Sequence, residues 1–406
     1  MRASPILLWG VMPGAEGCPL HGVRVVEFAG LAPAPFAGLL LADLGADVVR
    51  VDRPGRPGEG RSPVSALGRG RRSIALDLKD QFQVSVARQL IDRADVLIEG
   101  FRPGVMERLG LGPAECCDSN PGLVYGRLTG WGQTGTWAQM AGHDLNYIAV
   151  SGVLEPIGPQ GQPPTPPLNL VGDFAGGGML LALGVMAALL ERVRSGHGQV
   201  IDAAMVDGAA LLGTFVFAQL NHGRWSPTRG SNPLDGSAPF YATYETADHR
   251  YVSVAAIEPQ FYAELLERLA LNDIDPIAQH DRAAWPVLRQ RLRETFRRRT
   301  RDDWETVFAG SDACVAPVLS PHEASRHPFH RERKTFVDVG DGPEPAPAPR
   351  FSRTPGQVAS RSPDQAGEDT EAVLRDWGFS TVQIAALRCG VDVLGVGDGH
   401  GSVTLP

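Results

Sequence analysis

Short apolar runs alternate with helical patterns over the first third of the chain. Residues 23–28 fit a strand, 35–44 a helix that Gly45 ends, and 47–51 a second strand, which together make a βαβ unit. The pattern repeats, and it predicts strands at 73–78, 95–98 and 123–128 and helices at 81–93 and 104–109. Because crossover helices join parallel strands, we expect an α/β fold whose large domain is Rossmann-like with a parallel sheet.

Two helical stretches rich in Ala and Gly follow, at about 174–194 and 204–220, with a turn and a short strand between them. The longest apolar stretch, Phe174 to Leu190, is 17 residues and reaches the lower limit of a membrane span by length alone. It contains three consecutive glycines and is bounded by Asp173 and Glu191. We therefore predict a buried helix and no membrane span.

The pattern of predicted elements changes at about residue 226. Residues 241–246 and 251–256 fit the two strands of a hairpin, and helices are expected at 259–269 and 284–298. These elements indicate a smaller α+β domain. Residues 339–366 are rich in Pro, Gly, Ala and Ser and predict an extended connection, after which 370–377 fits a last helix.

These patterns predict four segments of the chain. They are an N-terminal extension at 1–17, a large domain made of 18–225 with 335–380, a small α+β domain at 226–334, and a loose C-terminal tail at 381–406.

Composition narrows the class of protein. The 406 residues carry 38 Lys and Arg against 46 Asp and Glu, a net charge of −8, which argues against a general nucleic-acid partner. Five cysteines without a CxxC spacing predict a reducing compartment, no disulfide framework and no metal site. Only Lys79 and Lys334 are lysines, an arginine bias typical of G+C-rich genomes, and the final residues are not a peroxisomal Ser-Lys-Leu signal. A bacterial cytoplasm is the expected location.

A dinucleotide fingerprint is missing from the first βα turn. Residues 30–35 read Gly-Leu-Ala-Pro-Ala-Pro, with no G-x-G-x-x-G between strand and helix. NAD and FAD are therefore not implied, and no cofactor is expected.

His143 stands out among ten histidines because a glycine-rich approach precedes it and a helix start follows it. A histidine placed there faces free N–H groups that can hold a developing negative charge. The alternative is that Asp144 or Asn146 simply caps the helix.

Two carboxylates are further candidates. Asp173 precedes the long apolar run, so it is either the N-cap of that helix or a carboxylate at the edge of an apolar pocket, and the two roles are compatible. Glu258 lies between an apolar strand end and Pro259. The alternative for Glu258 is an acidic residue at a helix N-terminus, ahead of a proline at the first helical position.

At these residues the chain resembles the family III CoA-transferase superfamily (CaiB/BaiF-like), and within it the racemases that act on α-methylacyl-CoA. The resemblance covers about residues 20–380 and depends on several strings in one order. They include LAPAPFA at 31–37, the segment 41–55, LDLK at 76–79, FRPGV at 101–105, GHDLNY at 142–147, PLNL at 167–170, GDFAGGG at 172–178 and AIEPQFY at 256–262.

The resemblance implies a Rossmann-like large domain, a small α+β domain and an interlocked homodimer. The active site would lie between the large domain of one subunit and the small domain of the other. His143 and Asp173 would be the two acid/base groups, and Glu258 would pair with His143. The CoA contacts implied by the resemblance fall on Arg53, Leu76, Asp77, Leu78, Lys79, Arg102, Arg108, Gly142, Asp144, Leu145, Asn146 and Tyr147.

The implied activity is interconversion of (2R)- and (2S)-2-methylacyl-CoA thioesters, an isomerase reaction of lipid metabolism. Inversion at C2 requires two proton carriers on opposite faces of a planar enolate, which a histidine and a carboxylate supply. Arginines suit the CoA phosphates, and the run Arg69 to Arg72 is either a further phosphate contact or a solvated basic loop. The rival function is a CoA-transferase that uses Asp173 as nucleophile. A catalytically silent acyl-CoA-binding homologue is the third possibility.

Overall fold

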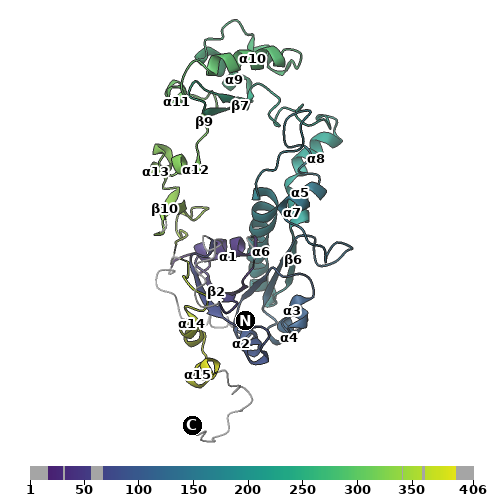
Figure 1. The fold of residues 1–406 in the computed structure, drawn as a ribbon, viewed down its shortest axis with the longest axis vertical. Coiled ribbons are helices and arrows are strands. Elements are labelled where there is room, and N and C mark those ends of the chain that lie inside the picture. The colour runs from purple at the N-terminus through teal and green to yellow at the C-terminus, as the bar shows by residue number, and fades with distance from the viewer. Residues whose placement is uncertain (1–16, 31–32, 56–66, 341, 359–361, 390–406) are drawn as a thin grey trace, which may run out of the picture. The chain divides into compact units, whose positions relative to one another are not determined.

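The computed structural model describes residues 17–30, 33–55, 67–340, 342–358 and 362–389 (Figure 1). The chain divides into two compact units, which we describe one at a time. Unit 1 comprises Met1–Tyr147, Asn169–Leu211 and Val337–Pro406, and unit 2 comprises Ile148–Leu168 and Leu212–Phe336. Unit 2 thus contains the expected small domain together with residues 148–168 and 212–225, which the sequence pattern assigned to the large one. The predicted extension at 1–17 lies outside the described residues except for Gly17.

Unit 1 is built on a six-stranded sheet. Its order is β3-β2-β1-β4-β5-β6 and all neighbouring strands are parallel, which is the order of doubly wound α/β sheets. The α/β prediction is therefore confirmed. The strands are β1 (Arg24–Phe28), β2 (Asp47–Asp52), β3 (Arg71–Ala75), β4 (Val96–Glu99), β5 (Val124–Thr129) and β6 (Val200–Ala204).

Helices cover both faces of this sheet. Strand residues such as Val25 and Val26 are therefore buried on alternate faces, and the strands are almost continuously apolar. One face packs against α2 (Gln81–Asp92), and the other packs against α1 (Pro33–Asp43) and α6 (Leu180–Ser195). The other helices of the described residues up to 212 include α3 (Val105–Arg108), α4 (Pro113–Ser119), α5 (Asp144–Val150), the π-helical segment η2 (Leu170–Met179) and α7 (Met205–Leu212).

The end of the chain returns to the α2 face of the sheet. Helices α14 (Thr370–Asp376) and α15 (Thr381–Cys389) add Val373, Trp377 and Ile384 to the core formed with α2. The prediction of a loose tail is thus wrong for 381–389, because the apolar side chains of α15 pack against this core. Residues 390–406 lie outside the described part of the chain.

The arginines at 69–72 are neither phosphate ligands nor a solvated loop. All three are buried, because carboxylates of unit 1 neutralise them inside the fold. The pairs are Arg69 with Asp43 at 2.7 Å, Arg71 with Glu27 at 2.8 Å and Arg72 with Asp47 at 2.7 Å.

Unit 2 contains a small antiparallel sheet in the order β7-β8-β9, and the hairpin prediction is confirmed. Its core joins Tyr244 and Val254 of the sheet to Leu265 and Leu292 of the helices. The elements are β7 (Tyr241–Glu245), β8 (Tyr251–Ala255), β9 (Val315–Pro317), α8 (Thr214–Asn221), α9 (Pro259–Arg268), η3 (Pro276–His280), α10 (Trp285–Phe296), α11 (Arg301–Phe308), α12 (Pro321–Ala324) and α13 (Pro328–Arg333). Strands β10 (Phe336–Asp338) and β11 (Pro343–Pro345) follow and pair with each other.

Segment η2 and helix α6 form the long apolar run. Leu170–Ser195 is, within the described ranges, the one helix that is long and apolar enough to cross a membrane by length and composition. Of its most apolar 18 residues, 39% are buried. The prediction of a buried helix holds for the face that packs on the sheet. It is wrong for the opposite face, where Met179, Leu183, Met186, Leu190 and Val193 are 37–83% exposed.

Candidate active site

A cavity of about 500 Å³ opens at the carboxyl edge of the unit 1 sheet. Its walls come from segments that follow four strands, with Pro33 after β1, Phe101 after β4, Gly130 after β5 and Met205 after β6. The strand order reverses between β1 and β4, which is the position where doubly wound sheets bind their ligands. The fold therefore indicates a ligand site here.

His143 lines this cavity from the residue before α5. Its backbone N–H donates to the Asn146 side chain at 3.1 Å, so Asn146 does contribute to the helix start. The imidazole makes no hydrogen bond within the described part of the chain and is exposed. The ring is thus available to a ligand in the cavity.

Asp173 lines the same cavity from η2. The N-cap position of this segment is Asn169, so the N-cap role considered for Asp173 is wrong. The glycines that follow allow η2 to pack closely, since a Cβ at Gly176 would lie 2.8 Å from the backbone nitrogen of Ala209 and one at Gly178 2.5 Å from the carbonyl of Pro33. A π-helical turn of this kind is rare and is frequent at functional sites.

The surroundings of Asp173 favour its protonated form. Partial burial raises the pKa of the Asp173 carboxyl, and the nearby Asp144 carboxylate raises it further. A hydrogen bond from the Asn169 amide, at 3.1 Å, and the proximity of His143 oppose this and lower the pKa. Because the net shift is upward, Asp173 takes up and releases a proton closer to neutral pH than an ordinary aspartate does.

An aromatic wall supports the His143 side of the cavity. Trp131 packs edge-on against Tyr147, with ring centroids 4.8 Å apart, and both residues line the cavity. The Tyr147 hydroxyl donates to the carbonyl of Gly142, and burial raises the pKa of Tyr147 to about 12. Tyr147 therefore stays neutral and fixes the backbone next to His143.

Of the predicted phosphate-binding arginines, Arg102 lines the cavity, whereas Arg53 and Arg108 are exposed and lie outside its lining. None of the three forms an ion pair with a residue of the described ranges. This sets them apart from the buried arginines of β3. Lys79 is exposed in the same way.

The other predicted CoA contacts lie in two places. Leu76 is buried in the sheet core, which leaves only its backbone for a ligand, and Leu78 packs partly against that core. Asp77 is half-buried, and its carboxylate accepts from the backbone N–H of Lys79 at 3.1 Å. In the 142–147 loop, Gly142 and Tyr147 line the cavity, Leu145 and Asn146 are exposed, and Asp144 is buried behind the wall.

The model of CoA-transferase family III matches residues 20–370 of the chain. The chain belongs to CoA-transferase family III. Alpha-methylacyl-CoA racemase of Mus musculus is 50% identical over 91% of this chain and 96% of its own length, and that of Homo sapiens is 47% identical over the same shares. A solved CaiB/BaiF family protein from Brucella suis superposes with a TM-score of 0.76 at 27% identity, covering 89% of this chain and 100% of the other.

Glu258 lies in unit 2 of this family III chain. It occupies the N-cap position of α9, directly before Pro259, and its exposed side chain makes no capping hydrogen bond. The description of Glu258 as an acid at a helix start is therefore correct as far as its local structure goes. Among the described residues it has no hydrogen-bond or ion-pair partner, so its side chain is available to another group.

Sequence reasoning missed Asn169 as part of the site. Its amide is the hydrogen-bond donor to the Asp173 carboxylate. The available signal was the spacing, because residues four apart lie on one side of a helix and their side chains meet. Asn169 stands four positions before Asp173.

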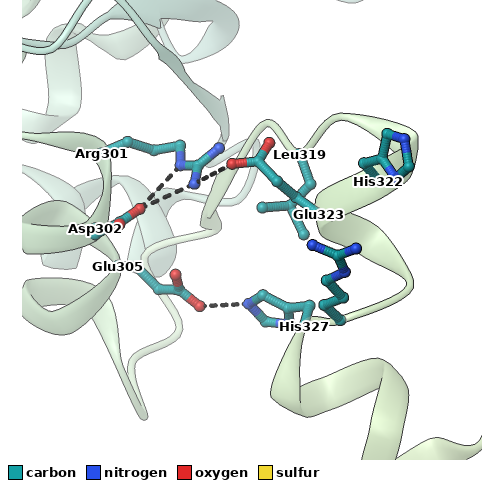
Figure 2. Close-up of a pocket in the computed structure, with 8 residues that line it drawn as sticks. Arg301, Asp302, Glu305, Leu319, His322, Glu323 and His327 are labelled. Atoms are coloured by element: carbon teal, nitrogen blue, oxygen red, sulfur yellow. Dashed lines mark hydrogen bonds and ion pairs between the residues drawn. The ribbon is translucent and has the colours of Figure 1, made fainter.

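His322 and His327 line a second pocket, in unit 2 (Figure 2). His327 lines it and pairs with Glu305 through Nε2 at 2.6 Å. No group of three or more His, Cys, Asp or Glu side chains suited to a metal occurs in the described ranges. The side chains of this second pocket pair with one another, as in an ion-pair network that stabilises the fold.

Proposed function

We propose that the chain is an α-methylacyl-CoA racemase, which interconverts (2R)- and (2S)-2-methylacyl-CoA thioesters. The observation that carries the proposal is that His143 and Asp173 line one cavity and neither is neutralised by an ion pair with a described residue. The 47–50% identity to curated racemases supports it. Unit 1 is then the CoA-binding domain.

The reaction needs one group to remove the proton at C2 and another to return it on the opposite face. In one direction Asp173 begins ionised and His143 begins protonated, and in the other direction the two states are exchanged. The raised pKa of Asp173 brings the carboxyl closer to the range in which imidazole titrates. The proton can then move both ways at one pH.

The intermediate enolate carries charge on its oxygen and needs donors. The N–H groups of Asp144 and Leu145 open α5, where no preceding helical turn supplies an acceptor. They stand next to His143 in the chain, so we assign them to the enolate oxygen. The chemistry requires no cofactor.

Arginines supply the charge that CoA needs. Arg102 at the cavity wall, with Arg53 and Arg108, would bind phosphate groups through forked hydrogen bonds. Focusing a few cations at one edge allows a chain of net charge −8 to bind an anionic ligand.

We further propose a homodimer of interlocked subunits. The apolar stripe that runs from Met179 at the end of η2 to Val193 of α6 supports this, because it is a continuous exposed face that a second copy would cover. Glu258 of the second subunit would then hydrogen-bond to His143 and stabilise its imidazolium form. Light scattering should give twice the chain mass of 43.4 kDa, and Leu190→Glu should shift it toward the single-chain value.

The free cysteines support a reducing compartment. Cys18, Cys116, Cys117 and Cys314 form no disulfide. We therefore propose that the enzyme works in the cytoplasm.

Transfer of CoA to a second acid is the competing activity in this family. There Asp173 would attack the thioester as a nucleophile and His143 would have no role. His143 in the lining of the same cavity therefore favours racemisation.

Incubation of one enantiomer of a 2-methylacyl-CoA in deuterated water tests the proposal. We expect α-deuterium incorporation together with loss of optical purity, with no acceptor acid present. A strict requirement for a second carboxylic acid would instead establish the transferase activity.

A further inference from the structure

We propose that Asp144 is a positioning residue that holds Asp173 in place through the backbone of η2. This rests on the proposed function, because it assumes that Asp173 carries a proton. The Asp144 carboxylate is buried and Asp144 is not among the residues that line the cavity, so this side chain acts through Asp173. The contact proposed above for the enolate oxygen uses only the backbone N–H of Asp144.

The contact is short, buried and closely packed. Oδ2 of Asp144 accepts a hydrogen bond from the backbone N–H of Asp173 at 2.7 Å, and Asp144 is 5% exposed. A Cβ on the preceding residue, Gly172, would lie 2.7 Å from the same oxygen. Glycine at 172 is therefore required for the carboxylate to reach the backbone.

The geometry of η2 explains why the bond is needed. In a π-helix each N–H donates to the carbonyl five residues earlier, so the first five N–H groups have no partner within the segment. Since Asn169 is the N-cap residue, the N–H of Asp173 is one of those five. A carboxylate from α5, 29 residues away in the chain, supplies the missing acceptor.

Asp144 also brings charge to the site. Its Oδ1 is buried and accepts no hydrogen bond from the described residues, so the negative charge is only partly compensated. The groups that share this field are His143 and Tyr147 near Asp144 in the chain, Arg102 from the loop after β4, and Asp173 itself. The charge of Asp144 raises the pKa of Asp173.

Three substitutions separate the effect of position from the effect of charge. Asp144→Asn retains a side-chain oxygen that can accept the Asp173 N–H but removes the charge, whereas Asp144→Ala removes both. Gly172→Ala leaves both carboxylates intact. It places a methyl group against Oδ2 of Asp144, the oxygen that accepts the backbone N–H of Asp173.

The test measures α-proton exchange against pH for the full-length protein. For Asp144→Asn we expect the limb of the profile that Asp173 sets to move to lower pH by about 0.5 to 1 unit, in both reaction directions. The sign follows because loss of a neighbouring negative charge lowers the pKa of a carboxyl. For Asp144→Ala and Gly172→Ala we expect kcat to fall about 10- to 100-fold because Asp173 is displaced.

Asp95→Asn is the matched control. Asp95 also accepts a backbone N–H, that of Arg24 at 2.8 Å, but at the start of β1 and β4 and thus at the opposite edge of the sheet. Its profile should match that of the unsubstituted protein. A pH profile that Asp144→Asn leaves unchanged would overturn the claim that the Asp144 charge acts on Asp173. Full exchange activity of Gly172→Ala would overturn the claim that Asp144 positions Asp173. Absence of exchange in the unsubstituted protein would refute the racemase function instead.

Discussion

Two pockets of this chain combine histidine, carboxylate and arginine side chains, and they use them in opposite ways. In the unit 2 pocket, Arg301 reaches Asp302 at 3.0 Å and Glu323 at 2.9 Å, and His327 reaches Glu305 at 2.6 Å (Figure 2). In the unit 1 cavity, His143 and Asp173 have no such ion pairs with the described residues.

The difference shows two uses of charged side chains. The ion pairs of the unit 2 pocket stabilise the fold, whereas the unpaired groups of the unit 1 cavity can react with a ligand. A charged side chain that already forms an ion pair within the protein contributes little binding free energy to a ligand. An unpaired group that faces a cavity is available to a substrate, and for one of the two groups, Asp173, burial also raises the pKa of the carboxyl. Residue type alone does not distinguish the two pockets, whereas the bonding partners do.

The largest expected effect is on catalysis. His143→Ala and Asp173→Asn should each lower the rate of α-proton exchange about 10²- to 10⁴-fold, because each removes one of two proton carriers. His327→Ala should leave the rate unchanged. Exchange in deuterated water, monitored by NMR, measures all three. Full exchange by both cavity variants would show that the unpaired groups are not the reactive ones.

A smaller effect is expected on stability in unit 2. His327→Ala removes the pair with Glu305 and should lower the free energy of unfolding by about 0.5 to 1 kcal/mol, since the pair is partly solvated. His322→Ala is the control, because His322 lines the same pocket but makes no side-chain hydrogen bond among the described residues. Urea denaturation of both variants measures the difference, and equal midpoints would contradict a stabilising role for the pair.

The last effect concerns stability in acid and is confined to low pH. The Arg301 guanidinium and the N–H of Ser320 lower the pKa of Glu323 to about 2. A carboxyl whose pKa is lowered by folding stabilises the fold above its unfolded pKa and loses that contribution as pH falls toward its folded pKa. Stabilisation by Glu323 should thus be complete at neutral pH and decline between about pH 4.5 and 2.

Glu323→Gln tests this. Its free energy of unfolding should differ most from that of the unsubstituted protein at neutral pH, and the two should converge as the pH falls. Glu332→Gln, at an exposed position of α13, should show no such convergence. A Glu323→Gln difference that stays constant down to pH 2 would refute the ion-pair explanation.

Much of the fold follows from local patterns. The strands and crossover helices up to residue 129 are confirmed within a few residues, because each has its own apolar period and a turn residue at its end. The π-helical form of η2 could not be predicted. It depends on the contacts of Gly176 and Gly178 with α7 and α1, which are distant in sequence.

The site divides in the same way. His143 and Asp173 were recognisable from their motifs, and the cavity brings them together. The partners of Arg69 and Arg71 were not recognisable, because Asp43 and Glu27 lie 26 and 44 positions earlier and nothing local marks the pairing. Helix α15 was missed for a similar reason, since only the core of a distant sheet explains its burial.

The return of α14 and α15 to the sheet of unit 1 has a consequence for biosynthesis. Trp377 and Phe379 fill the α2 face of a sheet whose strands are all translated by residue 204. The segment of unit 2 that ends at Phe336 is also translated before these two aromatic residues. Translation of unit 1 therefore begins before that of unit 2, but the core of unit 1 is completed only after all of unit 2 has been translated. In a nascent chain that stalls before α14, the part of this apolar core that Trp377 and Phe379 would cover is exposed to chaperones and to aggregation.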